Sequence, residues 1–408
     1  MTGFFLGGRT KPQTKQVGLV PACGGCGLHK TCQSPKMPVS GSGDLGILVV
    51  GEAPGETEDE ENTQFVGKTG QLLRKTVSRL GFDLDHDCWK TNALICRPPK
   101  NRKPTAAEIE FCRPSVIQTI KELKPRTIIL LGGVATESVI GHLWKQATGG
   151  ISTWAGFRVP CQRPNAWICP TYHPSHVARE DNEVITLWFE RHLEAAFNTV
   201  GRPWDEVPDW EGEVRVVMDP ERAARAVRKI AGKETGAAAF DYETTTLKPD
   251  TPWSEIVSCS VAWGMKKPEV TVAFPWLPET RAAVQELIRS PIPKIAQNMK
   301  FEDRWSIREF GHPVRNWVWD TMIAGHLIDN REGITGLKFQ AFAHLGFPAY
   351  NDHISPYLEG GGSRGKNQIR KLDPVELLRY NGLDSLLEWH LALRQVQMMG
   401  HDLPWRME

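Results

Sequence analysis

Apolar runs that end in glycine alternate with helical stretches along the first half of the chain. The segment LGILVVGEAPG (45–55) is a β-branched run that breaks into a Gly/Pro loop, and KPRTIILLGGVA (124–135) repeats the pattern. Helical patterns occupy GQLLRKTVSRLG (70–81) and TAAEIEFCRPSVIQTIKEL (105–123). Because alternating strands and helices form parallel α/β sheets, the pattern predicts such a sheet, with a site at the ends of its strands.

The pattern changes near residue 200. The segment GRPWDEVPDWEGE (201–213) is acidic, is broken by Pro, Gly and Trp, and has no periodicity. We interpret it as a linker between domains at 1–200 and 214–408. The second domain begins with a strand and a helix, continues with strands in GAAAFDYETTT (236–246) and EIVSCSVAWG (255–264), and is then mostly helical. The chain is therefore predicted to be α/β with two domains.

Composition adds three limits. The 408 residues exceed a single average domain, and the 40% apolar and 24% charged residues are ordinary for globular protein. A formal net charge of +1 gives no overall basic field, so positive charge for nucleic acid must be local. No stretch approaches the ~18 consecutive apolar residues of a membrane span, and the start lacks a signal core. A cytosolic protein without a membrane partner is expected.

The stretch QFVGKTGQLL (64–73) resembles the end of a phosphate-binding loop, because Gly67, Lys68 and Thr69 run into apolar residues. That motif, GxxxxGK followed by Ser or Thr, requires a glycine five residues before Gly67, where this chain has Asn62. The preceding ETEDEEN is acidic where a triphosphate would lie. The sequence therefore argues against nucleoside triphosphate hydrolysis.

Eight of the nine cysteines lie in the first half, which in a large cytosolic chain favours a metal or cluster site over disulfides. Cys23 and Cys26 form a CxxC, Cys96 lies in a loop after a predicted strand, and Cys112 lies in the following helix. Four thiolates from separated segments can hold a 4Fe-4S cluster or tetrahedral zinc, and chemistry alone does not choose between them. The other thiols of this half are interpreted as bystanders: Cys32, Cys88, Cys161 and Cys169.

Five segments, taken in chain order, are similar to the motifs of the family 4 uracil-DNA glycosylases. They are CGGCGLHKTC, VVGEAPGETEDEENTQFVGKTGQLL, KTNALICRPPKNRKPTAAEIEFCRP, LLGGVAT and CPTYHPSHVAR, and the likeness covers roughly residues 20 to 197. The resemblance implies an α/β/α uracil-DNA glycosylase fold with a parallel sheet. It also implies a 4Fe-4S cluster, whose ligand positions fall on Cys23, Cys26, Cys96 and Cys112.

Cleavage of the bond between uracil and deoxyribose requires an extruded base that is read on its hydrogen-bonding edge and stabilised as charge moves onto it. The resemblance places Asn92 at the base-reading position and His173, in the HPS turn, where it could donate to the developing charge. Phe65 could stack on the base, and Glu52 could position water or support the cationic sugar. Taken singly, each is also a common turn, loop or core residue. Ala53 and Arg102 are expected to contact the substrate.

Two features concern the rim of this site. The family usually has Gly-x-Pro-Phe before Val-Gly, whereas this chain has ENTQFVG, so the loop is altered. The basic run RPPKNRK (97–103) is most often a solvated face, but beside a cluster ligand it could bind phosphates flanking a flipped nucleotide. His176 and Arg179 could enter the vacated groove.

In AAAFDYETTT (237–246), the strand period of two places Asp241 and Glu243 on one face and Tyr242 on the other. Two carboxylates at a strand end suit a divalent metal. Further on, the segment YNGLD lies in a predicted helix. It sets Tyr380 and Asp384 four residues apart and hence on one side.

Together with AQNMKFEDRW, WDTMIAGHLID and LKFQAFAHLG, these motifs resemble the proofreading 3′-5′ exonuclease domain of family A DNA polymerases, over roughly residues 214 to 400. The resemblance implies a ribonuclease H-like mixed-sheet fold and two-metal hydrolysis. Asp241, Glu243 and Asp384 would hold two Mg²⁺ or Mn²⁺ ions, and Tyr380 would orient the attacking water. Asn298 is expected to contact the substrate.

The second exonuclease motif departs from the usual pattern, because Glu302 stands where an aspartate is normal and Asp303 follows it. Glu302 holds the aligned position, and its longer side chain could still reach a metal. Asp303 would need a change of register. We therefore favour Glu302 as a metal ligand and interpret Asp320 as structural or substrate-facing.

The sequence thus predicts a DNA-processing enzyme that joins an iron-sulfur uracil-DNA glycosylase to a 3′-5′ exonuclease. Two alternatives stay open: an exonuclease whose glycosylase-like half only senses uracil or DNA, and a non-catalytic replication subunit. The chain ends soon after Asp384, so we expect any DNA polymerase partner to be a separate polypeptide. The expected setting is the cytoplasm of a bacterial or phage-infected cell.

Overall fold

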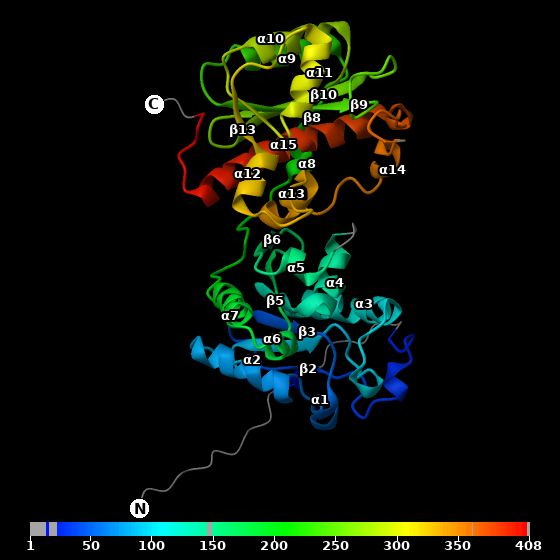
Figure 1. The fold of residues 1–408 in the computed structure, drawn as a ribbon, viewed down its shortest axis with the longest axis vertical. Coiled ribbons are helices and arrows are strands. Elements are labelled where there is room, and N and C mark those ends of the chain that lie inside the picture. Colours follow the sequence, from blue (N-terminus) through cyan, green and yellow to red (C-terminus); the bar gives the residue numbers. More distant parts are fainter. Residues whose placement is uncertain (1–13, 16–22, 145–148, 361, 406–408) are drawn as a thin grey trace, which may run out of the picture. The chain divides into compact units, whose positions relative to one another are not determined.

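The computed structural model describes residues 14–15, 23–144, 149–360 and 362–405. The chain divides into two compact units between Asp205 and Glu206, within the segment interpreted as a linker. Each unit is built around one sheet (Figure 1).

The N-terminal sheet has seven strands in the order β1-β2-β4-β3-β5-β7-β6. The central strands β4, β3, β5 and β7 are parallel, whereas β2 pairs antiparallel with β1 and β4, and β6 pairs antiparallel with β7. The predicted parallel sheet is confirmed for this centre, and the outer pairs make the whole sheet mixed. The strands are β1 (Thr14–Lys15), β2 (Val39–Ser40), β3 (Ile47–Gly51), β4 (Cys88–Asn92), β5 (Thr127–Leu131), β6 (Val159–Cys161) and β7 (Ala166–Thr171).

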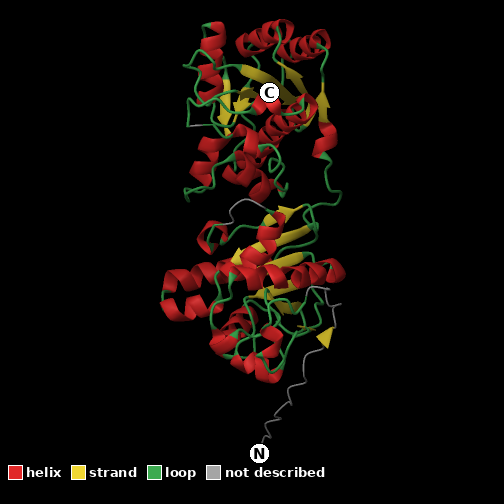
Figure 2. Cartoon of the chain, turned by 90° about the vertical axis from the view of Figure 1, so that its right-hand side faces the viewer, coloured by secondary structure: helices red, strands yellow, loops and turns green. Residues whose placement is uncertain are grey.

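Helices cover both faces of this sheet, which is why β3 is apolar and buried at every position. Ile47 and Val49 pack in one core with α2 and α7, and α4 also contacts β3. Figure 2 shows the helices alongside the strands. The α-helices are α1 (Glu56–Glu61), α2 (Lys68–Arg79), α3 (Ala106–Leu123), α4 (Gly132–Leu143), α5 (Ile151–Trp154), α6 (Pro174–Glu180) and α7 (Glu183–Phe197), with 3-10 turns at Leu28–Lys30 and Pro99–Asn101.

The C-terminal sheet has six strands in the order β13-β12-β9-β10-β11-β8. The pairs β9-β10 and β10-β11 are antiparallel, and the other three are parallel. The mixed sheet predicted for the ribonuclease H-like exonuclease fold is confirmed. The strands are β8 (Val214–Val216), β9 (Ala237–Thr244), β10 (Ile256–Gly264), β11 (Pro268–Pro275), β12 (Lys294–Ala296) and β13 (Trp317–Asp320).

Alternation along β9 sorts its side chains between the two faces of this sheet. Ala238, Phe240 and Tyr242 pack with α9 and α10, whereas Ala237 and Ala239 pack with α15. The acidic residues of β9 have odd numbers and so emerge toward α15. The helices are α8 (Trp210–Glu213), α9 (Pro220–Ala231), α10 (Pro278–Arg289), α11 (Lys300–Phe310), α12 (Thr321–Ile328), α13 (Leu337–Leu345), α14 (Ser355–Leu358) and α15 (Pro374–Met399), with a 3-10 turn at Ile369–Lys371.

The outer strand β13 carries an irregularity. Lys294 of β12 faces Trp317 and Ile295 faces Trp319, so Val318 is an extra residue in the ladder. Among the described helices, none has both the length and the apolar character needed to cross a membrane.

Candidate active sites

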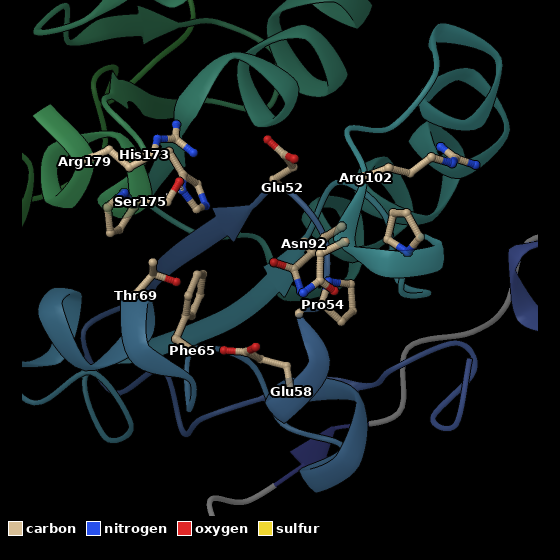
Figure 3. A pocket seen from close by; sticks show the side chains of 15 residues that line it. Glu52, Pro54, Glu58, Phe65, Thr69, Asn92, Arg102, His173, Ser175 and Arg179 are labelled. Atoms are coloured by element: carbon tan, nitrogen blue, oxygen red, sulfur yellow. Dashed lines mark hydrogen bonds between the residues drawn. The ribbon is translucent and has the colours of Figure 1, made fainter. Parts of the chain in front are cut away.

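A cavity of about 320 Å³ opens where the central parallel strands of the N-terminal sheet end. Glu52 follows β3, Asn92 ends β4, and His173 follows β7, so three strands each contribute one predicted side chain. Phe65 comes from the loop before α2, and Figure 3 shows all four side chains around the same space. The fold thus brings together the four residues predicted for glycosylase chemistry.

Glycine at two positions makes room for this arrangement. A Cβ on Gly51 would lie 2.3 Å from Asn92 Oδ1 and 3.0 Å from the Phe65 ring. A Cβ on Gly70 would lie 2.2 Å from the Phe65 carbonyl carbon. Phe65 itself has a φ of 58°, in the left-handed region that bulky residues rarely adopt. A strained backbone fixed by its surroundings in this way is typical of functional sites.

The Glu58 carboxylate stabilises the loop that carries Phe65 through a hydrogen bond. Its Oε1 accepts a hydrogen bond of 2.8 Å from the backbone N–H of Gly67, the N-cap of α2. In a phosphate-binding loop this amide would face a phosphate, but here it faces a carboxylate. The geometry therefore agrees with the sequence argument against a nucleotide site.

His173 presents a neutral imidazole with a defined tautomer. Burial, followed by the nearby Arg179 charge, lowers the pKa of His173 to about 4. Its Nδ1 accepts from the Ser175 backbone N–H at 3.2 Å and lies 2.7 Å from Ser175 Oγ. Because Nδ1 is an acceptor, the ring proton of the neutral form is on Nε2. A Cβ on Gly132 would lie 2.8 Å from His173 Cβ, so the glycine of LLGG admits this side chain.

Glu52 is a partly desolvated acid beside two cations. Burial raises the pKa of Glu52, and the positive charges of Lys103 and Arg179 act in the opposite direction. These cations give the rim of the cavity a local positive field although the whole chain is nearly neutral.

The predicted phosphate contacts are partly engaged within the protein. Arg102 lines the cavity together with Ala53, and its guanidinium donates to Glu108 Oε2 at 2.8 Å and Oε1 at 2.5 Å. Arg97 donates to Asn101 Oδ1 at 2.7 Å and Glu56 Oε1 at 3.0 Å. The other two basic residues of the run, Lys100 and Lys103, are exposed.

The predicted cluster ligands gather in one place. Cys96 and Cys112 are buried, and Cys23 and Cys26 pack against the same apolar group. Two backbone amides point at the sulfurs: Lys36 N donates to Cys96 Sγ at 3.2 Å and Ile95 N to Cys112 Sγ at 3.5 Å. Such N–H donors are the usual surroundings of thiolate ligands.

Cys32, which the sequence analysis interpreted as a bystander, packs beside this group. It packs against the same residues, and its charge helps to raise the pKa of Cys96, after burial, to about 12. The three remaining thiols of the N-terminal unit are buried in strands: Cys88, Cys161 and Cys169.

In the C-terminal unit, Asp241, Glu243 and Asp384 meet between β9 and α15. One carboxylate oxygen from each lies within 4.8 Å of the others, a spacing that suits a divalent metal ion. Burial and the charge of Asp384 raise the pKa of Asp241 to about 7, and burial and Asp241 raise the pKa of Glu243. Asn381 donates to Asp241 Oδ2 at 2.7 Å. The unit therefore holds a cluster of mutually repelling carboxylates, which bound cations would stabilise.

The second motif resolves into two different environments. Glu302 is 1% exposed, and burial and then the charge of Asp241 raise its pKa. Asp303 instead accepts from Val314 N at 2.8 Å and Trp317 Nε1 at 3.3 Å, outside the cluster. Of these two acids, only Glu302 is thus buried in the field of Asp241, a predicted metal ligand.

Asp320 fixes the start of two helices. Its carboxylate accepts from Met322 N and Ile323 N at the start of α12. It also accepts from Asn298 N at 3.2 Å and Met299 N at 3.0 Å, just before α11. Asn298, a predicted substrate contact, therefore has its backbone held by Asp320, in a left-handed conformation with φ 64°.

Three residues around Asp384 were missed from the sequence. The Tyr350 hydroxyl and the Lys338 ammonium both bond the Asp384 carboxylate. The ring of Tyr380, which was predicted, lies 4.4 Å from the same ammonium. Glu388 is 1% exposed and lies one turn after Asp384 on α15. That spacing could have revealed Glu388, whereas only tertiary packing reveals Lys338 and Tyr350.

Comparison with known proteins supports the family predicted for each half of the chain. Residues 38–198 match the uracil DNA glycosylase superfamily, and residues 214–355 match the 3′-5′ exonuclease family found in A-type DNA polymerases. A type-4 uracil-DNA glycosylase of Pyrobaculum aerophilum is 39% identical over 40% of this chain and 82% of its own length. The type-4 enzyme of Archaeoglobus fulgidus is 37% identical over 39% of this chain and 79% of its own.

A further relative spans both units. A DNA polymerase of Bacillus phage SP01 is 24% identical over 84% of this chain, which corresponds to 39% of the polymerase. Among solved structures, Escherichia coli RNase D aligns with 46% of this chain and 45% of its own, at 15% identity and a TM-score of 0.33. Through its N-terminal half the chain belongs to the type-4 uracil-DNA glycosylases, and its C-terminal half is a 3′-5′ exonuclease domain.

Proposed function

We propose that this enzyme hydrolyses the N-glycosidic bond of deoxyuridine in DNA with its N-terminal unit, and removes 3′-terminal nucleotides by two-metal hydrolysis with its C-terminal unit. The observation that carries the proposal is the convergence of Glu52, Asn92 and His173 from three strand ends on one cavity. The match to glycosylase relatives supports uracil as the base.

In the glycosylase step, the Asn92 amide reads the hydrogen-bonding edge of an extruded uracil and Phe65 stacks on its ring. As the glycosidic bond breaks, negative charge develops on a uracil oxygen, and the Nε2–H of neutral His173 donates to it. Glu52 supports the positive charge of the sugar and takes the proton of the water that attacks C1′. The bond to the base breaks, a C1′ hydroxyl forms, and the base leaves.

A 4Fe-4S cluster suits the four thiols of Cys23, Cys26, Cys96 and Cys112. Four thiols come from three segments, and backbone amides of Lys36 and Ile95 already point at two of the sulfurs. The cluster would supply a structural crosslink between the N-terminal segment, the loop after β4 and α3. We propose no chemical step for it.

In the exonuclease step, Asp241, Glu243 and Asp384 would hold divalent ions, with Glu302 beside Asp241. Two such ions would activate water and stabilise charge at the scissile phosphate. Tyr380, whose ring lies 4.4 Å from the Lys338 ammonium, would orient the water.

A role in repair or proofreading beside a DNA polymerase is supported by the SP01 relative, a DNA polymerase that is similar to this chain across both units. We keep a polymerase as the proposed partner and the cytoplasm of a bacterial or phage-infected cell as the proposed setting.

One DNA tests both activities: a strand with an internal uracil and a labelled 3′ end, incubated with Mg²⁺ and then treated with alkali. The wild type should release the 3′ label and give alkali cleavage at the uracil. Asn92→Ala should lose only the alkali cleavage, and Asp241→Asn should lose only the label release, so each variant is the control for the other.

Other outcomes would point elsewhere. Label release by the wild type without an abasic product would favour an exonuclease with a uracil-sensing domain. An intact label together with an uncut uracil would favour a non-catalytic subunit.

A further inference from the structure

Lys338 lies inside the carboxylate cluster of the exonuclease unit. It comes from α13, and its side chain is 17% exposed. The ammonium forms an ion pair with Asp384 and donates a hydrogen bond of 2.8 Å to the Tyr350 hydroxyl. It also lies 4.3 Å from the ring centroid of Tyr350 and 4.4 Å from that of Tyr380. Lys338 is therefore held by one carboxylate and two aromatic faces.

The cluster around it is strongly acidic. Asp241, Glu243 and Asp384 form its centre, and two more carboxylates are buried in their field, Glu302 and Glu388. Among the described residues, neither Glu302 Oε2 nor Glu388 Oε2 has a hydrogen-bond partner. The positive charge of Lys338 is felt by Asp241, Glu243 and Glu388. Lys338 thus serves as a counterion for the whole cluster.

The position of Lys338 conflicts with occupation of the site by metal. The Oδ1 atom of Asp384 is bonded by both Lys338 and Tyr350, and Asp384 is one of the three residues that could share an ion. An ion coordinated by that oxygen must displace the ammonium. The lysine side chain is flexible, and a DNA phosphate offers it another anionic partner.

We propose that Lys338 is a positioning residue that competes with a divalent ion for Asp384, and that the phosphate of a DNA 3′ end favours loading of the ion by drawing the ammonium away. The inference rests on the proposed two-metal function. Binding of the ion is then coupled to binding of DNA. Without DNA, the enzyme binds the ion at Asp384 weakly.

The test is a Mn²⁺ titration of the full-length protein, by calorimetry or by the electron paramagnetic resonance of free Mn²⁺. It is run with and without an oligonucleotide whose 3′-terminal linkage is a phosphorothioate. In the wild type, the oligonucleotide should tighten Mn²⁺ binding. Lys338→Met should bind Mn²⁺ roughly tenfold or more tightly without DNA, because a repelling charge at contact distance has been removed. The effect of the oligonucleotide should then largely vanish.

Three variants separate the possible results. Lys229→Met, at an exposed position on α9, should behave as the wild type. Lys338→Arg should keep weak binding without DNA, because the charge is retained. Asp241→Asn tests the metal site itself, and unchanged Mn²⁺ binding in that variant would refute the proposed two-metal exonuclease function. A different result would overturn only the role of Lys338. In that case Asp241→Asn loses Mn²⁺ binding as expected, whereas Lys338→Met, shown to be folded by circular dichroism, binds Mn²⁺ no more tightly than the wild type.

Discussion

Glu52 and His173 must both be deprotonated for the proposed chemistry, although burial shifts their pKa values in opposite directions. Burial raises the pKa of Glu52, so its carboxylate is lost as pH falls through a value above the usual 4.5. Burial lowers the pKa of His173 to about 4, so the imidazole stays neutral until lower pH. We expect kcat/KM for uracil excision to rise with pH on an acidic limb set by Glu52.

Glu52→Gln should therefore be slow and should lack that limb, as a pH profile from 4 to 8 would reveal. The matched comparison is Glu58→Gln, because Glu58 lines the same cavity but fastens the loop at Gly67. If the limb persists in Glu52→Gln with a midpoint near 4, His173 sets it.

The direction of a single side chain could be predicted where its residue lies at a strand end or on a helix turn. Asn92 ends a strand, and Asp241 and Glu243 share one face of another, so local periodicity indicated their directions. Lys338 and Tyr350 reach Asp384 from positions 46 and 34 residues away in sequence. Their contacts depend on how α13 and the following loop pack against α15, which no local pattern encodes.

The end of β3 packs closely against the side chains of the proposed uracil cavity. A Cβ on Gly51 would overlap Asn92 Oδ1 at 2.3 Å, so Gly51→Ala must displace the amide that is proposed to read the base. Because a misplacement of about 1 Å can cost on the order of 100-fold in rate, we expect at least that loss in single-turnover excision. Exonuclease activity of the same preparation should be unchanged.

Gly133→Ala supplies the control, because Gly133 lies in α4 and a Cβ there meets nothing within 4 Å. It should excise uracil at the wild-type rate. Wild-type excision by Gly51→Ala, with Asn92 still required, would contradict the packing described for the cavity.

The elements themselves were largely predictable. Continuous apolar runs indicated β3 and β5, because helices on both sides bury such strands completely. The outer pairs of the N-terminal sheet were not foreseen as antiparallel. β2 has two residues and β6 has three, too few to show a period.

At the scale of the whole molecule, the proposed iron-sulfur cluster and the proposed divalent ions belong to different units. We therefore expect uracil excision and exonuclease activity to be separable. The four thiols proposed to hold the cluster lie in the unit before Glu206, and the carboxylate cluster lies in the unit after Asp205. We expect EDTA, added briefly, to stop release of a 3′ label while uracil excision and the iron content of the protein persist. Added Mg²⁺ should restore label release. Parallel loss of both activities, with iron retained, would show that the units depend on each other.

The bulge in β13 has a consequence for association between copies of the protein. An open sheet exposes unpaired backbone groups along its outer strands, where a second chain can add. At Val318 the extra residue interrupts that row, β8 offers only three residues, and β6 contains Pro160, which has no N–H. These three edges therefore give other copies little backbone to pair with, which disfavours edge-to-edge aggregation at β13, β8 and β6.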